Sequence, residues 1–237
     1  MKVGFIGLGK LGRDAAEVLS EKHEVTGYDP NINIPELSGT LQEACKNKDV
    51  VLVAVQTPHD KMYGGEKPTS HLPPKDFDYS YLIQAVKDVD EQVDEGTLIS
   101  VISTVLPGTV RREVLPLIKN GKFIYNPYLI AQGTVKWDMR NPEMIMIGTS
   151  SGKDDDQSNA LRKVYDPILQ KETRYVIGTW EEIEALKVFY NTFITTKLCL
   201  VNMIQDVAMK VGNINVDVVT DALKYSTHRI MGPAYMM

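Results

Sequence analysis

The sequence predicts an α/β fold, a doubly wound and mostly parallel sheet, followed by a long central helix and a small helical segment. Short apolar, β-branched runs of strand length recur along residues 1–178, with helical stretches between them. These runs are nearly continuous rather than alternating, which is typical of parallel strands covered by helices on both faces. After residue 178 the strand pattern stops and a long helical pattern begins.

Seven apolar runs are the expected strands, and helices are expected between them. The strands are predicted at residues 3–6, 25–28, 50–55, 98–102, 123–125, 144–147 and 175–177. Residues 56–79 contain several prolines and glycines and no periodicity, so we expect an unusually long loop there. A loop of this length is either functional or a flexible surface excursion.

The long helix is predicted from Thr179, because Thr179 and Glu182 have capping-box spacing and no Gly or Pro follows until Gly212. Its apolar residues surround the helix instead of forming one stripe, so we expect burial on several sides and a homodimer through this helix. Asn215 is expected to cap a shorter helix over residues 217–224, and residues 226–237 are expected to be irregular.

Composition excludes several classes of protein. The chain is 43% hydrophobic and 24% charged, which is typical of a globular protein, and its net charge is only −5. Without a dense basic cluster, neither nucleic acid nor an anionic membrane is an expected partner. Cys45 and Cys199 lie far apart and the histidines have no metal-ligand spacing, so no disulfide or metal site is predicted. The first strand pattern starts at Lys2, without room for a leader, and a cytoplasmic location is expected.

A glycine motif follows the first predicted strand and opens a helix. It reads Gly7-Leu8-Gly9-Lys10-Leu11-Gly12. In this context Gly7 permits a tight turn, Gly9 lets the backbone approach a pyrophosphate, and Gly12 allows close packing of helix on strand. The start of the helix supplies free amides and positive dipole. The motif therefore predicts a dinucleotide site in a Rossmann-like domain.

Asp29 indicates which dinucleotide is bound. It stands at the end of the second predicted strand, 17 residues beyond Gly12, where a carboxylate can accept hydrogen bonds from the adenosine ribose. The 2′-phosphate of NADP would meet a negative charge there, and residues 30–32 provide no arginine for it. We therefore predict NAD, although Asp29 could also be a simple turn or cap residue.

An ordered set of motifs resembles one family over nearly the whole chain. The set comprises residues 7–12, Val55-Gln-Thr-Pro58, Ser103-Thr-Val-Leu-Pro-Gly-Thr109, Tyr125-Asn-Pro127, Lys187-x-x-x-Asn191 and residues 229–235. It is similar to the UDP-glucose/GDP-mannose (nucleotide-sugar) dehydrogenases. The resemblance implies an NAD enzyme that oxidises a sugar alcohol to a uronic acid, through a thiohemiacetal and a thioester. It divides the chain into an NAD-binding domain, 1–178, and a truncated dimerisation region, 179–237.

The resemblance also implies roles for single residues. Thr57 and the following Pro58 belong to a cofactor loop beside the nicotinamide ribose, and Thr104 positions the cofactor and a catalytic water. Lys187 and Asn191 are the catalytic pair; four residues apart on a helix, they share one face and can stabilise a developing alkoxide. The alternatives are a local turn at Thr104, and a snorkelling surface lysine at 187 with Asn191 capping a loop.

The sequence departs from the family at the hydrolytic step. Two family glutamates fall on Tyr128 and Gln132, and a phenol of ordinary pKa is a poor base at neutral pH. The family's nucleophilic cysteine loop would follow residues 229–235, so this cysteine and the nucleotide-sugar-binding domain are expected to be absent from these 237 residues. Cys199 lies roughly 12 Å along the helix from Asn191, too far to replace the cysteine, and is expected to pack in the core.

Three functions stay open. The first is a nucleotide-sugar 6-dehydrogenase, incomplete here for four-electron oxidation, that takes a nucleotide sugar as its partner. The second is a non-catalytic or partner-completed NAD module. The third is a two-electron alcohol dehydrogenase that uses Lys187 and Asn191 without a thiol.

Overall fold

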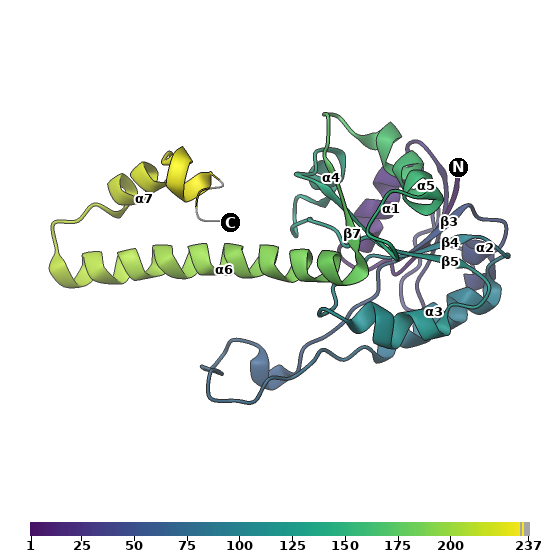
Figure 1. The fold of residues 1–237 in the computed structure, drawn as a ribbon, viewed down its shortest axis with the longest axis horizontal. Coiled ribbons are helices and arrows are strands. Elements are labelled where there is room, and N and C mark those ends of the chain that lie inside the picture. The colour runs from purple at the N-terminus through teal and green to yellow at the C-terminus, as the bar shows by residue number, and fades with distance from the viewer. Residues whose placement is uncertain (233, 235–237) are drawn as a thin grey trace. The chain divides into compact units, whose positions relative to one another are not determined.

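A computed structural model describes residues 1–232 and 234, and it has a seven-stranded sheet (Figure 1). The strands are β1 (Lys2–Ile6), β2 (Glu24–Tyr28), β3 (Val50–Val53), β4 (Leu98–Val101), β5 (Lys122–Tyr125), β6 (Ile145–Thr149) and β7 (Tyr175–Thr179). Their order is β2-β1-β3-β4-β5-β6-β7, and every neighbouring pair is parallel except β5 and β6. The predicted fold class is confirmed, and the third strand ends two residues earlier than expected.

Helices cover both faces of this sheet (Figure 1). They are α1 (Gly12–Ser20), α2 (Leu41–Cys45), α3 (Ser80–Gln92), α4 (Val135–Arg140), α5 (Asp156–Tyr165), α6 (Trp180–Val211) and α7 (Val216–Lys224). Successive residues of β3 alternate between two cores: Val50 and Leu52 pack with α1, α4 and α5, whereas Val51 and Val53 pack with α2, α3 and the start of α6. This alternation explains why the strand sequences are apolar throughout.

Residues 56–79 form the predicted long loop, whose only regular element is a turn at Lys61–Tyr63. The loop is closed at its base, where the amide of Asp78 donates to the carbonyl of Pro58 at 2.8 Å. Further along, the Tyr63 hydroxyl donates to the carbonyl of Pro73 at 2.6 Å. These bonds satisfy backbone groups that no neighbouring strand pairs.

The long helix α6 spans 32 residues and begins with the predicted capping box. The amide of Thr179 donates to the Glu182 carboxylate at 2.7 Å, and the amide of Glu182 donates to the Thr179 hydroxyl at 3.3 Å. The chain forms two compact units, Met1–Val188 and Phe189–Met237, and α6 runs from one into the other. The functional division expected at residue 178 stays a prediction.

In the second unit, Gly212 lies in the left-handed region with φ of +72° after the last turn of α6. Asn215 caps α7 as predicted, accepting from the amide of Asp217 at 3.0 Å. The expected irregular stretch 226–237 is wrong in part, because residues Thr227–Met231 form a helical turn. Residues 233 and 235–237, at the end of the 229–235 motif, lie outside the described residues. Among the described helices, none is long and apolar enough to cross a membrane.

Candidate functional site

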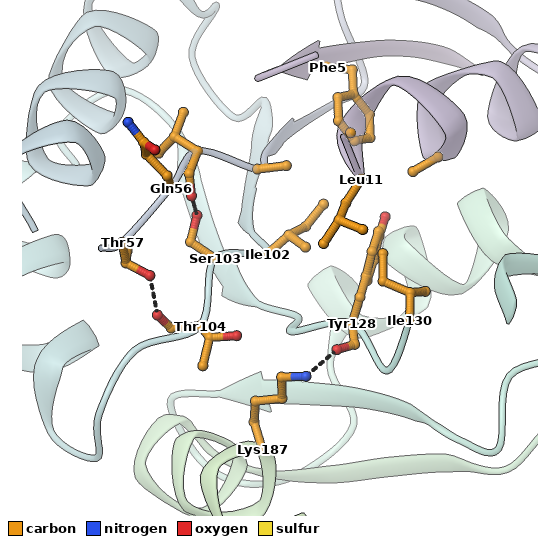
Figure 2. Close-up of a pocket in the computed structure, with 14 residues that line it drawn as sticks. Phe5, Leu11, Gln56, Thr57, Ile102, Ser103, Thr104, Tyr128, Ile130 and Lys187 are labelled. Carbon is orange, nitrogen blue, oxygen red and sulfur yellow. Dashed lines mark hydrogen bonds between the residues drawn. The ribbon is translucent and has the colours of Figure 1, made fainter. Parts of the chain in front are cut away.

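A cavity of about 210 Å³ opens at the carboxyl edge of the sheet, beside the ends of β1, β3 and β4 (Figure 2). The chain continues from β1 to β2 on one side and reaches β3 and β4 on the other, so this edge is the topological switch point of the sheet. Its lining includes Leu11, Gly12, Thr57, Thr104, Tyr128, Ile130 and Lys187. Residues far apart in the sequence therefore converge where an open α/β sheet binds ligands.

The glycine turn lies between β1 and α1. Gly7 has φ of +98°, which favours glycine, and its amide donates to the carbonyl of Tyr28 at 2.9 Å. A Cβ on Gly12 would lie 1.9 Å from the carbonyl oxygen of Gly7, so this position has no room for a side chain. A Cβ on Gly9 would meet nothing within 4 Å. The turn thus leaves open space beside the backbone at Gly9, as the approach of a pyrophosphate requires.

Asp29 joins the end of β2 to this turn. One carboxylate oxygen accepts from the amide of Leu8 at 2.9 Å, and the other accepts from the amides of Asn31 and Ile32 at 2.9 and 3.1 Å. The turn role and the ribose role that the sequence left open are therefore compatible, because a carboxylate has about four acceptor positions. Neither Asp29 nor Lys10 lines the cavity.

Two threonines connect the loops that follow β3 and β4. The Thr57 hydroxyl donates to the carbonyl of Thr104 at 2.7 Å (Figure 2). Next to this bond, the Ser103 hydroxyl donates to the carbonyl of Val55 at 2.6 Å. Both threonines line the cavity, whereas Pro58 lies just outside it, at the base of the long loop. Side-chain hydrogen bonds therefore hold the two loops together at the cavity.

Lys187 brings a buried cation to the cavity. Its side chain is 8% exposed, and its ammonium donates to the backbone carbonyl of Tyr128 at 2.7 Å (Figure 2). Burial lowers the pKa of this ammonium, because the charged form loses hydration. Among the ion pairs of the described residues, none includes Lys187. Asn191 lies further along α6 in the second unit, where its side chain is exposed, and its role at the cavity stays a prediction.

The two positions that depart from the family's glutamates differ in place. Tyr128 lines the cavity, but its hydroxyl lies 2.8 Å from the hydroxyl of Tyr165. The Tyr165 hydroxyl in turn donates to the side-chain oxygen of Asn126. Burial raises the pKa of the Tyr128 phenol, which removes it further from base chemistry at neutral pH. Gln132 is exposed and does not line the cavity.

Sequence reasoning missed Glu184, a fully buried carboxylate on α6 three residues before Lys187. It accepts from two backbone amides of the loop after β4, those of Gly108 and Val110. The sequence did offer one signal for Glu184: it is an acidic residue on the same side of the predicted helix as Lys187. The described residues include no group of three His, Cys, Asp or Glu side chains placed to hold a metal ion.

Comparison with known proteins finds a family whose model matches this chain. The model of the UDP-glucose/GDP-mannose dehydrogenase family, NAD binding domain, matches residues 31–169, more than half of the chain. The UDP-glucose 6-dehydrogenase of Rickettsia prowazekii is 25% identical over 171 residues, which are 70% of this chain and 36% of that protein. The GDP-mannose 6-dehydrogenase of Pseudomonas putida is 27% identical over 254 residues, 90% and 54% of the two chains.

Solved structures share the fold. A ternary complex of GDP-mannose dehydrogenase from Pseudomonas aeruginosa superposes with a TM-score of 0.83 at 24% identity, over 100% of this chain and 59% of that one. The 3-hydroxyisobutyrate dehydrogenase of Mycobacterium tuberculosis has a TM-score of 0.65 at 18% identity, over 95% and 70%. The chain thus spans between about a third and a half of the length of the two curated relatives described above.

Proposed function

We propose that this chain is the cofactor-binding part of a nucleotide-sugar 6-dehydrogenase. It belongs to the UDP-glucose/GDP-mannose dehydrogenase family and carries its NAD-binding domain. The observation that carries the proposal is the convergence of Thr57, Thr104 and Lys187 on one cavity at the switch point of the sheet. Chemistry at this cavity would occur beside the nicotinamide of NAD, which accepts a hydride when it is bound.

The three parts of NAD are assigned to three parts of the edge. The open backbone at Gly9 and the start of α1 would hold the pyrophosphate, because a helix start offers free amides and positive dipole. Asp29 would accept from the ribose of the adenosine half. The nicotinamide half would then extend toward Thr57 and Thr104, which lie beyond the glycine turn on the next strands.

Lys187 would act on the substrate. A buried ammonium stabilises negative charge strongly, because the surroundings have a low dielectric constant and the cation is already in place. An alcohol that loses a hydride to the cofactor also loses its proton, which water would take up, and oxyanion character develops on its oxygen. Lys187 would stabilise that oxygen, and Asn191 would support it as an amide donor, as the family resemblance implies.

A two-electron alcohol dehydrogenase is the second candidate, and Tyr128 favours it. Its hydroxyl is engaged with Tyr165, and burial raises its pKa, so the phenol does not replace a carboxylate base. Hydrolysis of a thioester would lack its water-activating group, whereas a single hydride transfer would need only the cofactor, Lys187 to stabilise the oxyanion, and water to take the proton. An NAD module that is non-catalytic, or is completed by a partner, is the outcome if no oxidation occurs.

We expect the chain to bind NAD at least about tenfold more tightly than NADP, because the added phosphate meets the Asp29 carboxylate. Asp29→Asn should reduce this preference, since asparagine removes the charge; its oxygen can still accept from the amide of Leu8, although its NH₂ group then faces the amides of Asn31 and Ile32. Calorimetric titration of both cofactors measures the ratio. Asp14→Asn, which removes a charge from the first turn of α1, is the control and should leave the ratio unchanged. Equal affinities in the wild-type chain would contradict the role of Asp29.

A homodimer through α6 is also part of the proposal. Beyond Val188, the apolar side chains of α6 are largely exposed in the single chain. They include Phe189, Phe193, Ile194, Leu198, Leu200, Val201, Met203, Val207, Met209 and Val211. So large an apolar surface is typical of an interaction site. A second copy of the same helix offers a matching apolar surface, and self-complementary contacts of this kind are the commonest in oligomers.

Sedimentation equilibrium should therefore report twice the chain mass of 26.5 kDa at tens of micromolar. Leu198→Lys should shift the chain toward monomer, because Leu198 is 61% exposed on α6 and a lysine there would place a charge in the apolar contact. Asn159→Lys, at an exposed position of α5, adds the same charge outside this surface and should stay dimeric. A wild-type monomer at these concentrations would contradict the proposal.

A further inference from the structure

The loop after β4 carries Thr104 and is fastened by side chains from several elements. Thr57 and Ser103 connect its first residues to the loop after β3. In its middle, the amide of Leu106 donates to the Tyr79 hydroxyl at 3.1 Å. Because this loop has no strand pairing to fix its backbone, hydrogen bonds of this kind give it a defined shape.

At its far end the loop is held by Glu184. One carboxylate oxygen accepts from the amide of Gly108 at 2.5 Å, and the other accepts from the amide of Val110 at 2.7 Å. Gly108, the first of these two donors, has φ of +89°, in the left-handed region that favours glycine. The Glu184 side chain has no exposed surface, so its bonds to the loop do not compete with bulk water.

Glu184 also has a fixed relation to Lys187. The two residues are three apart on α6, so their side chains leave the same face of the helix. Lys187 reaches the cavity from this face, and Glu184 holds the loop whose earlier residue Thr104 lines the same cavity. The nearby contact between Arg111 and Glu181 also joins loop to helix, but both partners are well exposed. Exposed pairs contribute little, so Glu184 is the stronger connection.

We propose that Glu184 is a positioning residue, which fixes the loop of residues 103–110 against α6 so that Thr104 and Lys187 face one cavity. This inference rests on the proposed function, because it assigns the nicotinamide half of NAD to that cavity. It predicts that loss of Glu184 weakens contacts to the nicotinamide half and spares the adenosine half, which binds at the glycine turn.

The test compares NAD with ADP, which has the adenosine and both phosphates but neither the nicotinamide nor its ribose. In Glu184→Gln, one carboxylate oxygen becomes an NH₂ group that faces a backbone amide, donor against donor. We expect the dissociation constant for NAD to rise about tenfold, with that for ADP unchanged within about twofold. A role limited to overall stability would change both ligands alike. Glu181→Gln, one turn earlier on α6, is the control and should change neither.

Thermal unfolding, monitored by circular dichroism, first establishes that Glu184→Gln folds. If it does not, Gly108→Ala tests the same contact from the loop side, because a Cβ there meets no atom within 4 Å but the left-handed backbone is strained. The same selective loss of NAD affinity is expected. If the wild-type chain binds neither ligand, the proposed function fails. If it binds both and the folded variant binds NAD as tightly as wild type, the positioning role of Glu184 alone is wrong.

Discussion

Replacing Gly9 by alanine should strongly weaken NAD binding and leave the fold intact. A Cβ at Gly9 meets no protein atom within 4 Å, and Gly9 is not among the glycines with positive φ, so alanine fits the folded chain without strain. The added methyl group instead occupies the space that the proposed pyrophosphate site needs for close backbone approach. We expect the dissociation constant to rise on the order of 100-fold or more, about 2.7 kcal/mol.

Thermal unfolding distinguishes this effect from a loss of structure. The melting temperature of Gly9→Ala should equal or slightly exceed that of wild type, because alanine restricts the unfolded chain more than glycine does. Gly12→Ala is the contrasting variant: its Cβ would lie 1.9 Å from the carbonyl oxygen of Gly7, so both stability and binding should fall. A folded Gly9→Ala that binds NAD as tightly as wild type would show that the dinucleotide binds elsewhere.

The second large effect concerns the reaction. We expect the 237-residue chain to bind NAD and yet to form no uronic acid from UDP-glucose or GDP-mannose. Tyr128 and Gln132 stand where the resemblance places two carboxylates. The Tyr128 hydroxyl is hydrogen-bonded to that of Tyr165. Gln132 is exposed and does not line the cavity. Loss of a general base costs roughly 10²–10⁴ in rate.

Appearance of NADH, together with product analysis, separates the three functions. One NADH per sugar with an aldehyde product supports the two-electron dehydrogenase, and binding of NAD without NADH formation supports the module. In the first case Lys187→Ala should abolish the activity, because the cavity loses its buried ammonium. Lys163→Ala, at an exposed position of α5, is the control and should be fully active. Two NADH per sugar with stoichiometric uronate would contradict our expectation.

Local sequence patterns predicted the sheet and the long helix, because these elements follow from apolar runs, glycine turns and caps that lie close together in the sequence. The capping box at Thr179 and the cap at Asn215 are examples. The end of β3 was placed too late, since Ala54 and Val55 continue the apolar run after the strand has ended at Val53.

The site was harder to predict where it depends on distant contacts. The bond between the hydroxyls of Tyr128 and Tyr165 joins residues 37 apart, and those of Glu184 to the loop join residues 74 and 76 apart. Such pairs have no spacing rule, because they arise only when the fold brings together the loops after β4 and β5 and the helices α5 and α6. The burial of Lys187 was likewise visible in the sequence only as a lysine within an apolar stretch.

The central claim is that the nicotinamide of NAD lies in the cavity between the loops after β3 and β4. Nuclear magnetic resonance of threonine methyl groups tests this claim most directly. Saturating NAD should shift the methyl signals of Thr57 and Thr104, which line this cavity, and should leave that of Thr149, outside its lining at the end of β6, in place. ADP, which has neither the nicotinamide nor its ribose, should shift none of the three. If NAD binds and the signals of Thr57 and Thr104 stay where they are, the nicotinamide does not occupy this cavity and the account is wrong.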